Sequence, residues 1–121
     1  MKYLILIADI DEFNPCKNSL GDLVKKEYKI KHMPAFDFEY NNHEVTTVCF
    51  GIGKVNAAMG AALALTLGEY DGVINTGWSG AVSGVKKGEI IASDSCVECD
   101  FDLTPIGRLP GQKPGQDDYI Y

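Results

Sequence analysis

The sequence predicts an α/β fold, with a mixed β-sheet and one long buried helix. Short runs rich in Val, Ile and aromatic residues recur along the chain, glycine turns follow two of them, and a long helical stretch separates the fourth run from the fifth. Strands that alternate with a helix are typical of α/β proteins. Because 121 residues is an ordinary size for one domain, we expect a single domain over residues 1–121.

The first expected strand covers 3–8, a continuous apolar run typical of a parallel strand that is buried on both faces. A turn follows it, and a short helix is expected within 18–26. An exposed edge strand comes next, over 28–33, and Pro34 is expected to end it. Asn41-Asn42 is a turn signal. The remaining strands are expected over 36–40, 44–50, 72–76 and 89–93.

The long helix is expected to run from Lys54 to about Leu67, with Gly68 as its C-cap. Most of its residues are Ala, Leu and Met, and the polar exceptions are Lys54, Asn56 and Thr66. A helix that is apolar nearly all round is buried on more than one side. We therefore expect it to pack on the sheet and also against a second subunit or another domain.

Composition excludes several classes of partner. The net charge is −6, and no basic cluster is larger than Lys25-Lys26, so nucleic acid is not an expected partner. The longest apolar run, 3–8, is too short to span a membrane, and the acidic residues after it are not those of a signal peptide. We expect a cytoplasmic protein with no membrane partner, whose four cysteines are reduced thiols.

Cys96 and Cys99 have the spacing of a metal or redox pair. A zinc site usually takes four ligands in two spaced pairs, and the other cysteines and the two histidines form no second pair. A thioredoxin-like motif needs its first cysteine at a helix N-terminus, whereas this pair follows an expected strand. We expect no metal site and no cofactor.

Loops beyond the carboxyl ends of strands carry the ligand sites of open α/β sheets. Three such loops are 9–13, 51–53 and 77–80. In the first loop, Glu12 has the chemistry of a general base, provided that partial burial holds it near its target proton. The alternative is an acidic turn in solvent. Asp9, which follows Ala8 at the strand end, is expected to point toward a cleft.

The two glycine loops have alternative interpretations. Gly51-Ile52-Gly53 opens a helix as a dinucleotide-binding fingerprint does, but Asn56 replaces the third glycine and the acidic partner residue is missing. A tight glycine turn before a helix terminus is the alternative. Trp78, the only tryptophan, stands beside Gly77, where a flat ring would line a pocket for a sugar or base. Ordinary core packing explains Trp78 as well.

Several blocks of the chain occur together in one known family, in the same order and spacing. They are 51–58, 74–77 with 79–80, 87–91 with 93–94, and 100–104 with 107 and 110–115. On these blocks the chain resembles the amino-terminal half of the 5′-methylthioadenosine/S-adenosylhomocysteine nucleosidases, of the purine nucleoside phosphorylase/uridine phosphorylase superfamily. The resemblance implies a partial α/β/α sandwich of the phosphorylase/hydrolase-like type. It also implies hydrolysis of the N-glycosidic bond of methylthioadenosine or S-adenosylhomocysteine.

The resemblance assigns roles to the candidate residues. It implies that Glu12 is the carboxylate that activates water and that Ile52 lies beside the 5′-thio group. The implied substrate-binding residues are Ala8, Asp9, Ile52, Trp78, Ser79 and Gly80, the last three at the ribose and water site. In the family a loop from the neighbouring subunit closes the pocket, and the residues that match it are Leu103, Ile106 and Pro114. The implied partners are therefore a purine nucleoside and a second copy of the chain.

The chain departs from the family pattern in three respects. Trp78 stands where the family has a small residue, and Asp9 replaces an apolar one. The later half of the family, which supplies a Met-Glu pair for the ribose and an aspartate that protonates adenine, has no counterpart in the 121 residues. We expect a truncated nucleosidase-like domain that is inactive alone. The alternatives are one half of a split nucleosidase, completed by another chain, or a pseudoenzyme that binds a nucleoside or a protein. A phosphorylase is disfavoured, because the phosphorylases of the superfamily use arginines to hold phosphate. The only arginine here, Arg108, lies in the late loop.

Overall fold

The computed structural model describes residues 1–93, 96, 98, 100 and 102–109. The chain divides into two units, Met1–Gly80 and Ala81–Tyr121. The first unit contains the sheet and both α-helices, and the described part of the second contains one 3₁₀ helix, Thr104–Ile106. That residues 1–121 form one domain stays a prediction.

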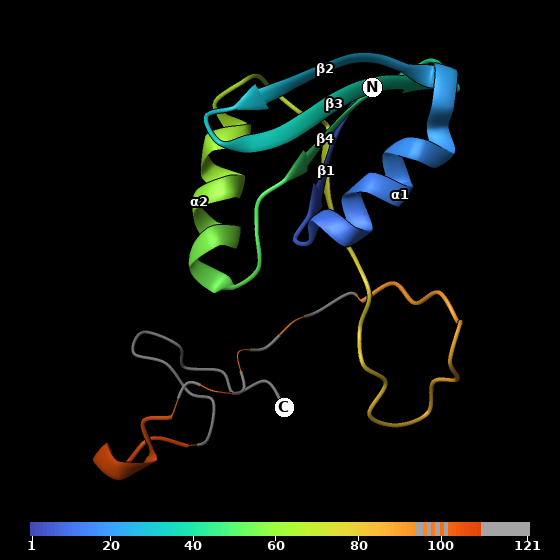
Figure 1. Cartoon of the computed structure of the whole chain (residues 1–121). Helices are drawn as coiled ribbons and strands as arrows, with labels where there is room; N and C mark the ends of the chain where they lie inside the picture. The colour runs from blue at the N-terminus through green and yellow to red at the C-terminus, as the bar shows by residue number, and fades with distance from the viewer. Residues whose placement is uncertain (94–95, 97, 99, 101, 110–121) are drawn as a thin grey trace. The chain divides into compact units, whose positions relative to one another are not determined.

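The first unit is built on a five-stranded sheet in the order β2-β3-β4-β1-β5 (Figure 1). The strands are β1 (Lys2–Ile7), β2 (Val24–Ile30), β3 (Met33–Tyr40), β4 (His43–Cys49) and β5 (Gly72–Thr76). β1 lies parallel to β4 and to β5, and Leu4 is opposite Thr46 on one side and Val73 on the other. β3 is antiparallel to both of its neighbours. The predicted α/β fold with a mixed sheet is therefore confirmed.

Two helices cover opposite faces of this sheet (Figure 1). α1 (Ile10–Leu20) buries Phe13, whose ring lies 5.1 Å from that of Phe36 between ring centroids. The rest of this core comprises Ile7, Phe38, Val45 and Cys49. α2 (Lys54–Leu65) buries Gly60 and Ala64 on the other face. Its partners there include Leu4, Leu6, Met33, Val48 and Phe50. Alternate residues of β1 and of β4 thus serve the two cores.

The first helix begins earlier than expected. The sequence predicts a turn after the first strand and a helix within 18–26, but α1 starts at Ile10 and ends at Leu20. The Asp9 side chain accepts a hydrogen bond from the Asp11 backbone N–H at 3.0 Å and so caps the helix, which outweighs the presence of Pro15 inside it. A short 3₁₀ turn, Gly21–Leu23, then leads directly into β2.

The hairpins follow the turn chemistry of the sequence only in part. Asn41 and Asn42 have φ angles of 48° and 64°, as expected of a two-residue hairpin turn, so this predicted turn is confirmed. Pro34, in contrast, does not end a strand. It is the second residue of β3, opposite Lys29, because the chain has already turned at Lys31 with a φ of 57°. A proline is tolerated near the start of a strand.

The expected strand over 89–93 is wrong. These residues have no regular structure, and Ile90 is fully exposed. A strand requires a neighbour with which to exchange backbone hydrogen bonds, and none of the described residues pairs with this segment. An apolar run predicts a strand only when the partner strand is also present.

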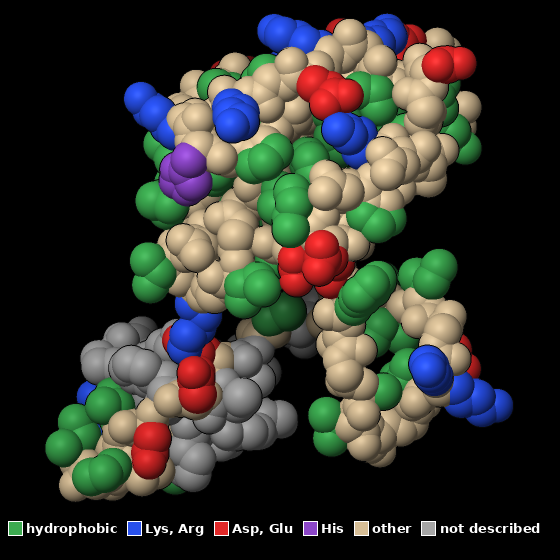
Figure 2. Space-filling model, viewed as in Figure 1, with side chains coloured by type: hydrophobic (Ala, Val, Ile, Leu, Met, Phe, Trp, Pro, Cys, Tyr) green, Lys and Arg blue, Asp and Glu red, His purple; other side chains and the backbone are tan. Residues whose placement is uncertain are grey.

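α2 packs on the sheet and leaves its other side exposed in the single chain. It ends at Leu65 with Thr66 as its C-cap, so Gly68 does not cap it. Val55 is 82% exposed and Leu65 47%, and Figure 2 shows hydrophobic side chains on the surface along this side of the first unit. The predicted packing of one face on the sheet is confirmed, while packing of the other side against a second subunit or another domain stays a prediction. No helix of the described residues has the length and hydropathy needed to cross a membrane.

Candidate functional site

A hollow of about 650 Å³ lies beyond the carboxyl ends of β1, β4 and β5. It is formed by the three loops that the sequence singles out, because the carboxyl ends of parallel strands meet at one edge of a sheet. The candidate residues that line it are Ala8, Asp9, Glu12, Ile52, Trp78 and Ser79. Gly80 follows directly but does not line it. The structure thus brings six of the seven candidates from the first unit together.

Glu12 lies in the first turn of α1, and its side chain reaches across to the loop after β5. Its Oε1 accepts a hydrogen bond from the backbone N–H of Trp78 at 2.7 Å. The neighbouring Phe13 is only 3% exposed and anchors the helix on the sheet, which fixes the direction in which Glu12 projects. Glu12 is half-buried rather than free in a solvent-exposed turn. A carboxylate held in one place beside a hollow has the geometry of a general base.

Asp9 is the second carboxylate of the hollow, but it has a structural partner. Its Oδ1 accepts the Asp11 backbone N–H at 3.0 Å, as an N-cap side chain does. The expectation that Asp9 lies at the cleft agrees with its place in the lining. The Asp9 carboxylate is therefore engaged at the start of α1.

Ile52 and Trp78 expose large apolar surfaces at the hollow. Ile52 is 70% exposed and Trp78 is 83% exposed, so core packing does not explain the tryptophan in this chain. Gly51 and Gly53 have φ angles of 93° and 102°, which only glycine adopts readily, and the Asn56 Nδ2 donates to the Ile52 carbonyl at 2.8 Å. The tight glycine turn is therefore confirmed, and it holds Ile52 outward.

Cys49 lies beneath the hollow at the end of β4. Burial raises the pKa of its thiol, and the negative charges of Asp9 and Glu12 raise it further, while a backbone hydrogen bond from Gly51 acts in the opposite direction. The thiol therefore stays protonated and is not a nucleophile. Within the part of the chain that the structure describes, no three His, Cys, Asp or Glu side chains are grouped as metal ligands.

The residues expected from a neighbouring subunit belong to the second unit. Leu103 precedes the 3₁₀ helix Thr104–Ile106 and is half-buried, and Ile106 is 73% exposed. Pro114 lies outside the described residues. Their contribution to a pocket stays a prediction.

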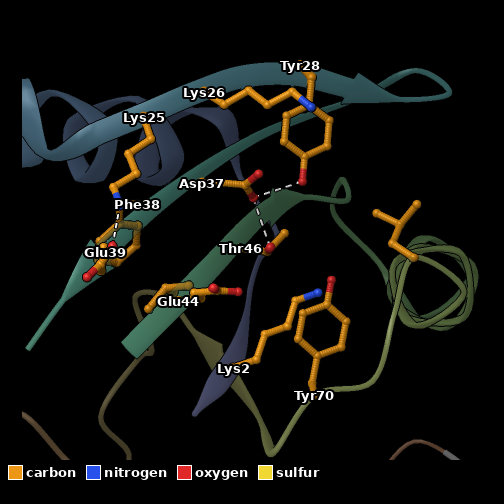
Figure 3. Close-up of a pocket in the computed structure, with 12 residues that line it drawn as sticks. Lys2, Lys25, Lys26, Tyr28, Asp37, Phe38, Glu39, Glu44, Thr46 and Tyr70 are labelled. Carbon is orange, nitrogen blue, oxygen red and sulfur yellow. Dashed lines mark hydrogen bonds and ion pairs between the residues drawn. The ribbon is translucent and has the colours of Figure 1, made fainter. Parts of the chain in front are cut away.

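A second hollow, of about 450 Å³, was not expected from the sequence (Figure 3). It lies near the amino ends of β1 and β4 and contains none of the candidate site residues. At its floor one oxygen of Asp37 accepts hydrogen bonds from the Tyr28 hydroxyl and the Thr46 hydroxyl, both at 2.9 Å. Burial and the neighbouring Asp37 raise the pKa of Tyr28 to about 12. The sequence signal for this cluster is a lone acidic residue between Phe36 and Phe38.

Known proteins match nearly the whole length of this chain. The family model of the phosphorylase superfamily matches residues 2–120. The chain belongs to the phosphorylase superfamily. Among curated members of this superfamily, the chain is 37% identical over 115 residues to a 5′-methylthioadenosine/S-adenosylhomocysteine nucleosidase of Haemophilus influenzae, covering 94% of this chain and 49% of the relative. It is 44% identical over 121 residues to the nucleosidase of Hydrogenovibrio crunogenus, covering 95% of this chain and 49% of the relative.

Solved phosphorylase superfamily structures have the same fold. The nucleosidase of Colwellia psychrerythraea, in complex with adenine, superimposes with a TM-score of 0.79 and 32% identity, covering 94% of this chain and 47% of that one. The chain spans about half the length of the curated relatives that it matches. The resemblance to these nucleosidases, stated from the sequence, is confirmed.

Proposed function

We propose that the hollow beyond β1, β4 and β5 is part of a purine nucleoside hydrolase site and that Glu12 activates its water. The observation that carries the proposal is the Glu12 carboxylate, held 2.7 Å from the Trp78 backbone nitrogen among three loops. The names of the relatives support methylthioadenosine or S-adenosylhomocysteine as the substrate, and the adenine bound to the Colwellia psychrerythraea enzyme supports a purine ligand. Ile52 and Trp78 then contact the apolar parts of the nucleoside.

The reaction needs two proton transfers on opposite sides of the sugar. Glu12 takes a proton from water while the water oxygen bonds to the anomeric carbon. The electron pair of the broken N-glycosidic bond goes to the purine, which requires a proton of its own. A general acid is worth about 10²–10⁴-fold in rate. Asp9 caps α1 and does not fill this role, so we propose that these 121 residues bind the nucleoside without turning it over.

An adenine-release assay with methylthioadenosine tests the proposal. The purified chain is expected to show no measurable turnover. Binding is followed by the fluorescence of Trp78, the only tryptophan, which is expected to change on addition of methylthioadenosine. Robust adenine release that vanishes on Glu12→Gln would overturn the proposal that these 121 residues do not turn the nucleoside over. The absence of any fluorescence response would contradict a nucleoside site.

Binding alone is a second candidate function, favoured by the 83% exposure of Trp78 at the hollow. A pseudoenzyme of this kind binds the nucleoside tightly and never turns it over, with or without a partner chain. We also propose that the exposed apolar residues of α2, among them Val55 and Leu65, are covered by a second copy or by a complementing chain in the cytoplasm.

A further inference from the structure

Gly77 lines the hollow, and a left-handed backbone does not explain the presence of a glycine there. Its φ lies outside the left-handed region, unlike those of Gly51 and Gly53 in the opposite loop. A positive φ is therefore not what requires a glycine at this position. The reason for a glycine between β5 and Trp78 must therefore be the space that a side chain would occupy.

That space is filled by the Glu12 carboxylate. A Cβ added to Gly77 would lie 2.7 Å from Glu12 Oε2 and 3.2 Å from both Cδ and Oε1. The first distance is shorter than any that real Cβ atoms adopt. The whole carboxylate thus lies against the backbone of Gly77 while its Oε1 accepts the N–H of the next residue at 2.7 Å.

We propose that Gly77 is a positioning residue, whose missing side chain lets the Glu12 carboxylate lie against the backbone of the loop after β5. The absent side chain lets the carboxylate approach closely enough to accept the Trp78 N–H, and this charge-assisted hydrogen bond then holds it in one orientation. The inference rests on the proposed role of Glu12 as the base, since a base is effective only when it is held at its target.

Gly80 provides a matched control within the same loop. It too has a φ outside the left-handed region, but a Cβ added there meets no atom within 4 Å. Gly80→Ala therefore tests the general effect of an added methyl group on the loop. Gly77→Ala tests the specific contact with Glu12.

The test is the backbone amide resonance of Trp78 in NMR spectra of the whole chain. A carboxylate hydrogen bond moves an amide proton downfield, so Glu12→Ala is expected to move the Trp78 resonance upfield. Gly77→Ala is expected to cause the same displacement, with Glu12 still present. Gly80→Ala is expected to leave the resonance at its native position. A Gly77→Ala chain that is folded and keeps the native Trp78 resonance overturns the proposal.

A second variant covers the case in which Gly77→Ala does not fold. Adding Glu12→Ala to Gly77→Ala removes the carboxylate and is expected to restore folding, with the Trp78 resonance as in Glu12→Ala alone. If the double variant also fails to fold, the obstacle is not Glu12 and the proposal is overturned. The resonance does not depend on turnover. Suppose that the Trp78 resonance moves as expected but the Trp78 fluorescence does not respond to methylthioadenosine. That result counts against the proposed function and not against the positioning role of Gly77.

Discussion

At the scale of single residues, the first turn of α1 uses two carboxylates three positions apart in different ways. Asp9 and Glu12 have the spacing of a capping box, in which the second acidic residue turns back to the backbone of the first. Here Asp9 caps the helix, whereas Glu12 accepts a hydrogen bond from Trp78 across the hollow. The helix terminus therefore needs only one of its two acids, and the other is available for the site.

The Tyr28–Asp37–Thr46 cluster makes stability depend on pH in the alkaline range. Because the folded-state pKa of Tyr28 is about 12 and an unfolded tyrosine titrates near pH 10, the protonated hydroxyl stabilises the fold fully below about pH 10. That stabilisation is lost as the pH rises through about 12. We expect the midpoint of urea unfolding to fall over this range in the native chain, and to fall less in Tyr28→Phe.

Tyr40→Phe is the matched control for this prediction, since the Tyr40 ring lies on the adjacent strand and is 59% exposed. It removes one tyrosine hydroxyl without touching Asp37. The control is expected to follow the native pH profile. An unchanged slope in Tyr28→Phe would show that the hydroxyl-to-carboxylate hydrogen bond does not contribute to stability.

At the scale of elements, the sequence predicts what depends on local pattern. β1, β4, β5 and α2 lie within a few residues of their expected positions, because apolar runs and glycine turns are local signals. α1 was missed because its start depends on a hydrogen bond of the Asp9 side chain, and Pro15 hides the helical pattern. The Tyr28–Asp37–Thr46 cluster of the second hollow depends on three strands brought together, which no single segment of sequence records.

The location of the site could be predicted from the sequence, but its detailed contacts could not. Parallel strands end at one edge of a sheet, so the convergence of loops 9–13, 51–53 and 77–80 follows from topology alone. The hydrogen bond between Glu12 and Trp78 does not follow from it. It depends on the absence of a Cβ at Gly77, which is visible only when the two loops face one another.

The contact of α2 with Phe50, which follows β4, leads to a prediction at this scale. An exposed helical Gly→Ala substitution stabilises by about 1 kcal/mol, but a Cβ on Gly60 would overlap the Cβ of Phe50 and lie 3.3 Å from Met33 Sδ. Overpacking costs roughly 1–3 kcal/mol. We expect Gly60→Ala to lower the free energy of unfolding by on the order of 1 kcal/mol in urea titrations.

Gly68→Ala is the control, because a Cβ there meets only the flexible end of Lys2, at 3.0 Å. Its effect on the free energy of unfolding is expected to stay within about 0.5 kcal/mol. A stabilised Gly60→Ala chain would mean that α2 lies farther from Phe50 than the structure places it.

At the scale of the whole molecule, β5 is an edge strand with the composition of a central one. It is parallel to β1, and parallel strands are normally covered on both faces. Val73 and Ile74 point to opposite faces, and each is 49% exposed. Sheets usually protect such an edge with charge, proline or a covering element. Together with the half-length match to the relatives, this predicts that a further polypeptide segment pairs along β5 and closes the hollow.

Complementation in trans tests this prediction. We expect adenine release from methylthioadenosine to appear when the chain is mixed with the half of the Hydrogenovibrio crunogenus nucleosidase that it does not match, and neither half to be active alone. Glu12→Gln should lower the restored rate by about 10²–10⁴-fold without weakening association, because it removes only the base.

Ile74→Lys should prevent association of the two halves, because it puts a charge on β5, where the further segment is predicted to pair. Glu69→Lys, on an exposed residue before β5, is the control for added charge and should keep the native rate. If Ile74→Lys leaves the restored activity unchanged, the further segment does not pair along β5.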